Sequence, residues 1–450
     1  MARIYPFRAW RYNPARVRLE DVVTQPYDKI SPAMQQAYYQ RSPFNLVRII
    51  LGLPELFDAE KGENVYTRAA RDFGAWREQG VLIQEKEPCV FAYSQRFTVP
   101  GTSERKERRG FIALGKLHEY GEQVVFRHEQ TLSKPKSDRL NLLKATRAHF
   151  GQIFMLYSDP AGSVDKLLFE GSGPPDGEVT DEYGVLHRIW RVNDPAVIRL
   201  LSSAMADKKL IIADGHHRYE TALNYCRDFA PQYAARQGAE ARGKAESLSA
   251  HQLAEPPFPE AAAMMTFVNM DAEGLVILPT HRVVHGLAGF DPKAFARAAA
   301  DFFIVKQLPD ADSQQHIRTL KSQSGPAFVA VTRSGALLLQ SKPEAIEKTL
   351  AEVPDRQRQL DLTHLHAILL DRLLGLNPEK VREQTNLRYL RDAGEAVDQV
   401  NRGEADVAFL TNAVTMEQLR EVAFAGEVMP QKSTDFYPKL LSGLAIYALE

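Results

Sequence analysis

Long apolar runs and cysteines are scarce in this chain of 450 residues. It contains no stretch of about 18 apolar residues, the length that a membrane-spanning helix requires. The N-terminal residues lack the apolar core of a signal peptide. The two cysteines, Cys89 and Cys226, have the spacing of neither a metal site nor a redox motif. These features predict a reduced, cytoplasmic protein without a membrane span.

An excess of charge of one sign is also missing. The formal net charge is -1, although 25% of the residues are charged and 44% are hydrophobic. Such a balance provides no general attraction to nucleic acid or to a membrane surface. A length of 450 residues exceeds one typical hydrophobic core, so we expect two or three domains.

Helical and strand patterns alternate along the chain. A Ser-Pro pair at 31–32 predicts a helix that runs to about residue 40, and a second helix is predicted over 65–79. Apolar or alternating stretches predict strands at 89–99, 109–120 and 151–157. Because hairpins are mixed with alternating strands and helices, we expect an α/β or α+β fold with a mixed sheet flanked by helices.

The composition changes between residues 231 and 262, which are rich in Ala, Glu, Gln, Arg and Pro. We interpret this segment as a linker or a surface insertion. It separates a predicted N-terminal α/β domain, residues 1–230, from a predicted C-terminal α/β domain, residues 263–450. Directly after it, the stretches 264–270 and 275–278 predict a β-hairpin.

The densest polar stretch is 214–221, Asp-Gly-His-His-Arg-Tyr-Glu-Thr. An apolar run at 209–213 predicts a buried strand before it, and the spacing of apolar residues from Tyr219 onward predicts a helix after it. Gly215 lacks a Cβ atom, so the backbone can turn sharply there or approach a ligand closely. Unpaired N–H groups at the helix start, together with the guanidinium of Arg218, favour a phosphate. The alternative is a helix start that these side chains merely cap and solvate.

A phosphate site at this turn would give each polar residue a role. Gly215, His216, His217 and Arg218 would bind the phosphate, and His216 could relay a proton. Asp214 would hold Mg²⁺ or act as the base for a substrate hydroxyl. Adjacent histidines on a helix point about 100° apart, so we do not expect them to share a transition metal.

Two further polar stretches could complete the site. Residues 128–139 contain His128, the second candidate base Glu129, and Arg139. Residues 429–439 contain Lys432 and Lys439, which suit a phosphate or a carboxylate. Ordinary solvated loops are the alternative for both stretches. We predict that at least one of them lies within contact distance of the 214–218 turn.

Two other patterns imitate nucleotide-binding motifs. Residues 110–116 fit most of a P-loop, but Leu117 stands where a Ser or Thr should reach Mg²⁺, and the stretch is apolar. Gly171-Ser-Gly173 is similar to the start of a dinucleotide loop, but the following Pro-Pro pair blocks the helix that should come next. We expect both to be structural.

The polar stretches resemble those of a bacterial and archaeal family called domain of unknown function 1015, and the match spans nearly the whole chain. It includes Pro26-Tyr27-Asp28, the 43–48 stretch around Asn45, residues 128–147, 213–222, 278–282 and 432–439. The resemblance implies family membership without an assigned activity. The expected substrate-binding residues are Asn45, His128 and Arg139.

The Asp-Gly-His-His-Arg core is also similar to the phosphate-binding signature of the ParB/sulfiredoxin-like superfamily. That superfamily includes kinases acting on free serine, CTP-binding partition proteins and ATP-using sulfiredoxins. Sulfiredoxins carry a Cys in the signature, whereas this chain has His216 or His217 in that neighbourhood. The resemblance therefore implies a phosphotransferase that uses ATP or ADP with Mg²⁺ on a small, serine-like hydroxyl acceptor. A regulatory nucleotide-binding module without turnover is one alternative; a nucleic-acid-binding protein is another, which the near-neutral charge disfavours.

Overall fold

The computed structural model describes residues 1–59, 62–129, 133–240, 253–309 and 312–450, with backbone only at 133–136 and 234–240. Contacts divide the chain into two compact units. Unit 1 comprises Met1–Phe126, Thr131–Val276 and Pro438–Glu450, and unit 2 comprises Arg127–Gln130 and Ile277–Tyr437. Each unit is assembled from segments that are not consecutive in the sequence. The division into domains 1–230 and 263–450 with a linker at 231–262 stays a prediction.

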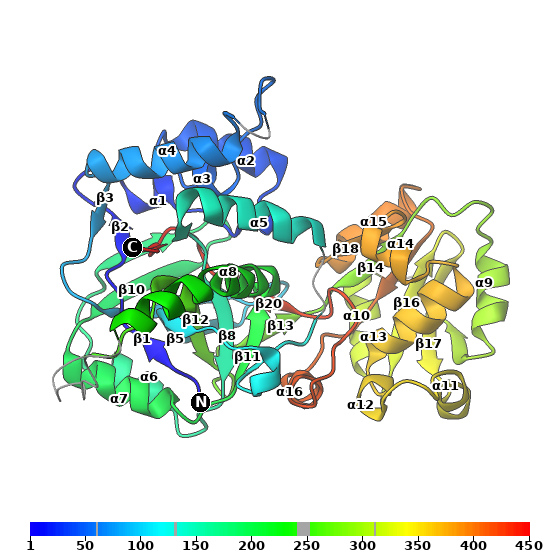
Figure 1. Ribbon diagram of the computed structural model, residues 1–450. Coiled ribbons are helices and arrows are strands. Elements are labelled where there is room, and N and C mark those ends of the chain that lie inside the picture. The colour runs from blue at the N-terminus through cyan, green and yellow to red at the C-terminus, as the bar shows by residue number, and fades with distance from the viewer. Residues whose placement is uncertain (60–61, 130–132, 241–252, 310–311) are drawn as a thin grey trace. The chain divides into compact units, whose positions relative to one another are not determined.

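Unit 1 is built on a nine-stranded mixed sheet with the order β6-β11-β8-β12-β5-β4-β10-β9, in which β1 also pairs with β5 (Figure 1). Strands β8 and β12 are parallel, as are β6 and β11, whereas the other pairs are antiparallel. The expected mixed sheet is thus confirmed. The strands are β1 (Ile4–Tyr5), β4 (Val90–Thr98), β5 (Arg105–Lys116), β6 (Val125–Phe126), β8 (Ile153–Tyr157), β9 (Gly177–Thr180), β10 (Leu186–Val192), β11 (Leu210–Asp214) and β12 (Ala262–Asn269).

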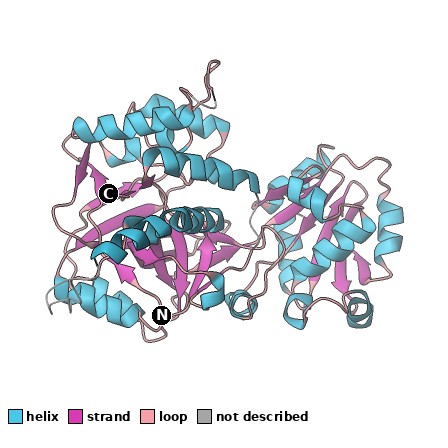
Figure 2. Cartoon of the chain, in the orientation of Figure 1, coloured by secondary structure: helices cyan, strands magenta, loops and turns pink. Residues whose placement is uncertain are grey.

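Helices flank this sheet, as Figure 2 shows. Helix α8 packs against β8 and β12, α5 packs on α8, and α4 packs on α5. Ser31 caps α2 by accepting a hydrogen bond from the Met34 N–H, so the predicted helix start is confirmed. The helices are α1 (Leu19–Val22), η1 (Tyr27–Lys29), α2 (Pro32–Arg41), α3 (Val47–Ile50), α4 (Val65–Glu78), η2 (Tyr120–Glu122), α5 (Ser133–Thr146), α6 (Ser163–Phe169), α7 (Pro195–Met205), α8 (His216–Glu240) and η3 (Pro259–Ala261).

The C-terminal segment, residues 438–450, is part of unit 1. Its strand β21 (Tyr447–Ala448) pairs with β7 (Ala148–His149), and Ile446 and Ser442 form bridges with Trp10 and Thr24. Ile446 lies in an apolar cluster with Phe73 and Trp76 of helix α4. A further pair, β2 (Trp10–Tyr12) and β3 (Leu82–Gln84), completes this layer. The segment is therefore anchored by backbone pairing and by apolar packing together.

Unit 2 contains an antiparallel six-stranded sheet with the order β15-β17-β16-β19-β14-β18. Its strands are β14 (His281–Val284), β15 (Phe303–Gln307), β16 (Ala327–Thr332), β17 (Gly335–Ser341), β18 (Leu387–Leu390) and β19 (Val407–Leu410). Its helices are α9 (Pro292–Ala299), α10 (Ser313–Lys321), α11 (Pro343–Thr349), α12 (Asp355–Arg358), α13 (Asp361–His364), the π-helix η4 (Leu365–Leu373), α14 (Pro378–Glu383), α15 (Ala393–Asn401) and α16 (Met416–Phe424).

The predicted hairpin over 264–278 is wrong. Strand β12 lies between β5 and β8 in the large sheet, whereas β13 (Val276–Leu278) pairs with β20 (Asp435–Tyr437). All eight residues of β12 are buried, which fits a central strand whose two edges pair with β5 and β8 and against which helix α8 packs. Across the described ranges, no helix has both the length and the apolar character for crossing a membrane.

Candidate functional site

The turn around Gly215 joins strand β11 to helix α8, as the sequence predicts. Gly215 has a φ angle of 91°, in the region that strains residues with a side chain. Its N–H donates a hydrogen bond to Oδ1 of Asp214 at 2.8 Å. A Cβ atom on Gly215 would lie 3.0 Å from Nε of Arg218. Glycine is therefore needed twice, for the turn itself and for the approach of the arginine.

The guanidinium of Arg218 lies against two glycines. A Cβ atom on Gly151 would be 3.4 Å from Nη1 of Arg218, so Gly151 leaves space on a second side. Nη1 donates a hydrogen bond to the carbonyl of Gln152, and Nη2 lies 3.9 Å from Oδ1 of Asp214. Only 16% of the Arg218 side chain is exposed. The backbone thus orients this cation beside the start of helix α8.

Asp214 carries the negative charge of the turn, and several cations surround it. Burial alone would raise the pKa of its carboxyl, but Lys439, Arg218, Lys29 and His216 together lower that pKa well below its ordinary value. The closest of these groups is Nζ of Lys439, 3.5 Å from Oδ2. The predicted convergence of a distant polar stretch on the turn is therefore confirmed by Lys439.

Side chains from two strands hold the backbone of Lys439. Gln95 on β4 donates from Nε2 to the Lys439 carbonyl at 2.7 Å, and Arg108 on β5 donates to the carbonyl of Pro438. Nε of Arg108 also donates to Oε1 of Gln95 at 3.0 Å. Arg108 is only 2% exposed, and burial lowers its pKa to about 10, so it is still a cation at neutral pH. The two side chains place Lys439 at the turn.

A buried network continues from Gln95 on β4 to His187 on the neighbouring strand β10. Nδ1 of His187 lies 2.6 Å from the hydroxyl of Tyr93 and 3.4 Å from Nε2 of Gln95. Its other ring nitrogen lies 3.2 Å from Oδ2 of Asp181, which also accepts a hydrogen bond from Gln25. Burial lowers the pKa of His187 despite the opposing effect of Asp181. Sequence reasoning missed this network because its members meet only through the pairing of β4 with β10.

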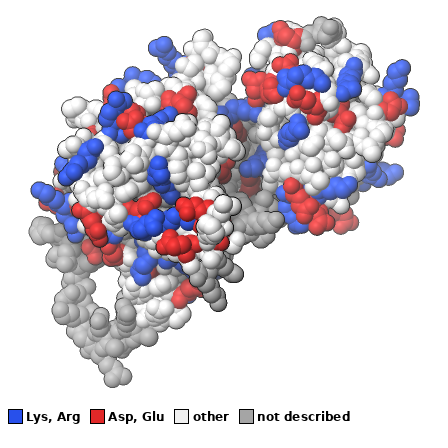
Figure 3. Space-filling model, turned by 90° about the horizontal axis from the view of Figure 1, so that it is seen from above, with Lys and Arg blue, Asp and Glu red and all other residues white. Residues whose placement is uncertain are grey.

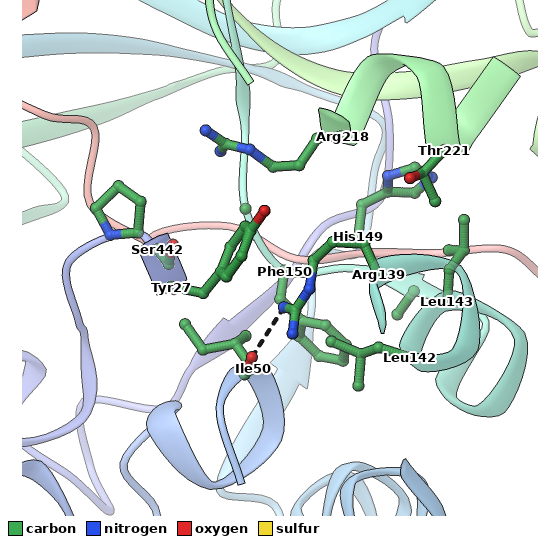
Figure 4. Close-up of a pocket in the computed structure, with 13 residues that line it drawn as sticks. Tyr27, Ile50, Arg139, Leu142, Leu143, His149, Phe150, Arg218, Thr221 and Ser442 are labelled. Carbon is green, nitrogen blue, oxygen red and sulfur yellow. Dashed lines mark hydrogen bonds between the residues drawn. The ribbon is translucent and has the colours of Figure 1, made fainter. Parts of the chain in front are cut away.

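A cavity of about 70 Å³ lies beside Arg218 (Figure 4). The Arg139 guanidinium stacks over the Tyr27 ring at 4.0 Å and donates to the carbonyl of Ile50 at 2.8 Å. Burial raises the pKa of Tyr27, so its hydroxyl keeps its proton at neutral pH. The cavity walls combine donors with apolar groups and contain no acidic residue: Pro26, Tyr27, Ile50, Arg139, Leu142, Leu143, Ala148, His149, Phe150, Gly151, Arg218, Thr221 and Ser442.

Asn45 does not line this cavity. It is completely buried, where its side chain donates to the Asp21 carbonyl at 2.8 Å and accepts from the Val47 N–H at 3.0 Å. Both ends of its amide are thus used in the local packing before helix α3. His216 is buried and His217 half-buried in the first turn of α8, and Arg139 lies on the cavity wall. The substrate-binding role of Asn45 stays a prediction.

The remaining predicted site residues belong to unit 2, where they hold the loop before β20. Oε1 of Glu129 accepts hydrogen bonds from the N–H groups of Ser433 and Thr434 at 3.1 and 3.3 Å. Nε2 of His128 lies 2.8 Å from the Thr434 hydroxyl. Lys432 adopts a φ angle of 58° in this loop. Their roles toward a substrate or a phosphate stay predictions.

No preformed metal centre was found in the described ranges: no group of three or more His, Cys, Asp or Glu side chains is arranged to hold an ion. A single carboxylate such as Asp214 is, however, enough for Mg²⁺ that arrives with a phosphate, since Mg²⁺ commonly uses one or two carboxylates plus phosphate oxygens and waters. The residues present fit Mg²⁺ carried in by a nucleotide better than a resident metal.

Comparison with known proteins identifies the family. The model of a family described as protein of unknown function, DUF1015, matches residues 4–363. The chain belongs to the DUF1015 family. The matched part of this DUF1015 protein contains the Gly215 turn and most of the cavity wall, whereas Lys439 and Ser442 lie beyond it. The Asp214–Lys439 pair therefore extends the site outside the matched region.

The curated proteins offer no sequence match to this DUF1015 protein. Similar solved structures include a free serine kinase in complex with AMP, which is 13% identical, with 71% of this chain and 89% of that chain covered and a TM-score of 0.32. A conserved hypothetical protein from Pyrococcus furiosus is 13% identical, with 72% and 91% covered and a TM-score of 0.34. C-terminally truncated SbnI from Staphylococcus aureus is 8% identical, with 74% and 85% covered and a TM-score of 0.34.

Proposed function

We propose that this DUF1015 protein binds the phosphates of ATP or ADP at the turn after β11 and transfers a phosphoryl group to a small hydroxyl-bearing acceptor. The observation that carries the proposal is the charge at Asp214. One carboxylate is accompanied there by the cations Lys439, Arg218 and Lys29, next to the N-terminus of helix α8. A surplus of positive charge at the N-terminal end of a helix is a favourable place for a phosphate, because the helix dipole adds to the attraction.

The lowered pKa of Asp214 limits what this residue can do. A carboxylate so strongly stabilised is a poor acceptor for the proton of a hydroxyl. Phosphoryl transfer depends mainly on positioning and on compensation of charge, because its transition state is loose in most analyses. We therefore assign to Asp214 the binding of Mg²⁺ or the orientation of the acceptor hydroxyl. Arg218 and Lys439 offset charge on the phosphate.

The cavity beside Arg218 is too small for a whole nucleotide. Its volume is about 70 Å³, whereas pockets for complete small-molecule ligands usually measure about 300–1,000 Å³. We assign to it one phosphate or one small anionic group of the acceptor. The absence of acidic residues from its wall and the presence of Arg218 and the Tyr27 hydroxyl support an anion. The guanidinium of Arg139 already pairs with Asp138, so its charge adds little.

Calorimetry with the full chain tests the proposal. We expect ADP or ATP to bind in the presence of Mg²⁺, and Arg218→Ala to weaken binding about ten- to a hundred-fold, the value of one charged hydrogen bond. Arg227→Ala is the matched control, because Arg227 lies on the same helix but pairs with Glu119 at the surface. Failure of both nucleotides to bind, or equal affinity of Arg218→Ala and wild type, would refute the phosphate site.

A second candidate is a nucleotide-binding regulatory module without turnover. The lowered pKa of Asp214 favours it, because no strong base has been assigned in the described part of unit 1. Phosphorus NMR of nucleotide incubated with hydroxyl-bearing acceptors separates the two candidates. Nucleotide binding without phosphorylated product supports the module. Nucleic-acid binding is disfavoured, since acidic and basic side chains are interspersed on the face shown in Figure 3.

A further inference from the structure

Unit 2 has a cavity of its own, with a volume of about 320 Å³. It shares no residue with the cavity beside Arg218, and its size falls within the usual range of about 300–1,000 Å³ for small-molecule sites. The turn before β16, the corner between α12 and α13, and the loop from β19 to α16 form its wall: Gly325, Pro326, Gln359, Leu360, Asp361, Leu362, Asn412, Ala413, Val414, Thr415 and Gln418.

Asp361 is the only charged residue of this wall. Its carboxyl is bonded to the side chain of Asn412, and no ion pair of Asp361 occurs within the described ranges. Burial raises the pKa of this carboxyl to about 6, against the opposing effect of Asn412. At neutral pH the cavity therefore contains a carboxylate without a compensating cation, which is unfavourable unless a ligand supplies one.

The charged side chains around Asp361 are engaged elsewhere. On α12, Arg358 pairs with Asp355, and Arg356 lies 3.5 Å from Glu427. His364, one turn along from Asp361, bonds to Ser341 and to the Arg358 carbonyl, and burial lowers its pKa. The other titratable groups on η4 and α16 are His366, Asp371, Arg372, Glu417, Arg420 and Glu421, and none of them contributes to the pKa shift of Asp361.

We propose that this cavity binds a small organic amine, whose ammonium group pairs with Asp361. The remaining N–H groups of an ammonium need neutral acceptors, and two residues that carry amide oxygens, Asn412 and Gln359, line the same wall. Thr415 and Gln418 also line the cavity, and they bond to each other as the cap of α16. A metal ion fits less well, because no group of three ligating carboxylate, imidazole or thiol side chains occurs in the described chain.

Calorimetry of the full chain with ethanolamine and putrescine as probes tests this site. Ethylene glycol is the neutral counterpart of ethanolamine. We expect the amines to bind at pH 8 and ethylene glycol not to bind. Affinity should fall about tenfold between pH 8 and pH 5, because the carboxyl, with its pKa of about 6, takes up a proton while the amines stay charged.

Matched variants complete the experiment. Asp361→Asn should weaken amine binding at least about tenfold, and Asn412→Ala should weaken it too, whereas Asp355→Asn should leave it unchanged. Asp355 lies on α12 and its side chain is 81% exposed, so this variant makes the same charge change outside the cavity. Binding of ethylene glycol equal to that of ethanolamine, or equal affinity in Asp361→Asn, overturns the proposal. Three further results would also overturn it. The amines could bind no more tightly than about 1 mM, Asp355→Asn could lose amine affinity, or KCl or MgCl₂ could bind more tightly than the amines.

Discussion

Nζ of Lys439 lies 3.5 Å from Oδ2 of Asp214, so the C-terminal segment of unit 1 supplies a cation to the end of strand β11. The pair lies beside Gly215 and Arg218, in the turn that the sequence marks as the densest polar stretch. Lysine alone would neutralise the aspartate. Together with Arg218 and Lys29 it leaves a positive surplus, which is the basis for a phosphate site.

Replacement of Lys439 by Ala should weaken nucleotide binding about ten- to a hundred-fold, the effect of losing one charged contact. The loss should shrink as salt is added, because added ions screen the interaction. Calorimetry at two salt concentrations measures both effects. Lys106→Ala is the control, since Lys106 lies on β5 of the same unit and pairs with Glu104. Equal losses in both variants would assign the effect to general charge rather than to the site.

Gly215→Ala should destabilise unit 1 and abolish binding. The φ angle of 91° strains any residue with a Cβ atom, at a cost of about 1–3 kcal/mol, and the new atom would displace Arg218. Gly80→Ala is the matched control, because Gly80 has a φ angle of 68° but open space around its missing side chain. Urea unfolding should show a loss of stability in both variants, and calorimetry should show lost nucleotide binding in Gly215→Ala alone. Normal binding by Gly215→Ala would contradict the placement of Arg218.

Gln95 should act on nucleotide binding only through Lys439. Gln95→Met removes the donor to the Lys439 carbonyl and the acceptor for Arg108, so we expect a loss of about 1–3 kcal/mol in stability. It should also weaken binding in the wild-type background but cause little further loss in Lys439→Ala. A double-mutant cycle by calorimetry measures this coupling. Additive losses would show that Gln95 does not position the lysine.

Asp361→Asn should stabilise unit 2 at pH 8 but not at pH 4. The folded-state pKa of about 6 lies above the ordinary value of 3.8, so folding favours the protonated carboxyl. Stability of the wild type therefore falls as pH rises from about 4 to 6 and is level above that, by about 1–3 kcal/mol in total. Thermal unfolding of both proteins at the two pH values measures the difference. A variant less stable than wild type at pH 8 would contradict the burial of an uncompensated charge.

Local chemistry allowed part of the site to be predicted. The succession of strand β11, Gly215 and helix α8 depends on three local signals: a short apolar run, one glycine and a helical repeat of apolar residues. All three are read from residues next to the turn itself. The cap of α2 at Ser31 is equally local. The same is true of residues 110–116, which form part of strand β5 and not a P-loop, as their apolar character predicts.

Which distant side chains join this turn depends on the fold of the whole unit. Gln95 and Arg108 reach the backbone of residues 438–439 because β4 and β5 pair with each other inside the sheet. Strand pairing depends on burial over the whole sheet, and for that reason the short hairpin predicted after residue 263 was wrong and β12 lies between β5 and β8. The glycine turn and the first residues of helix α8 follow from local sequence alone. The cations that make the turn a candidate phosphate site meet there only because folding of unit 1 brings Lys439 to Asp214.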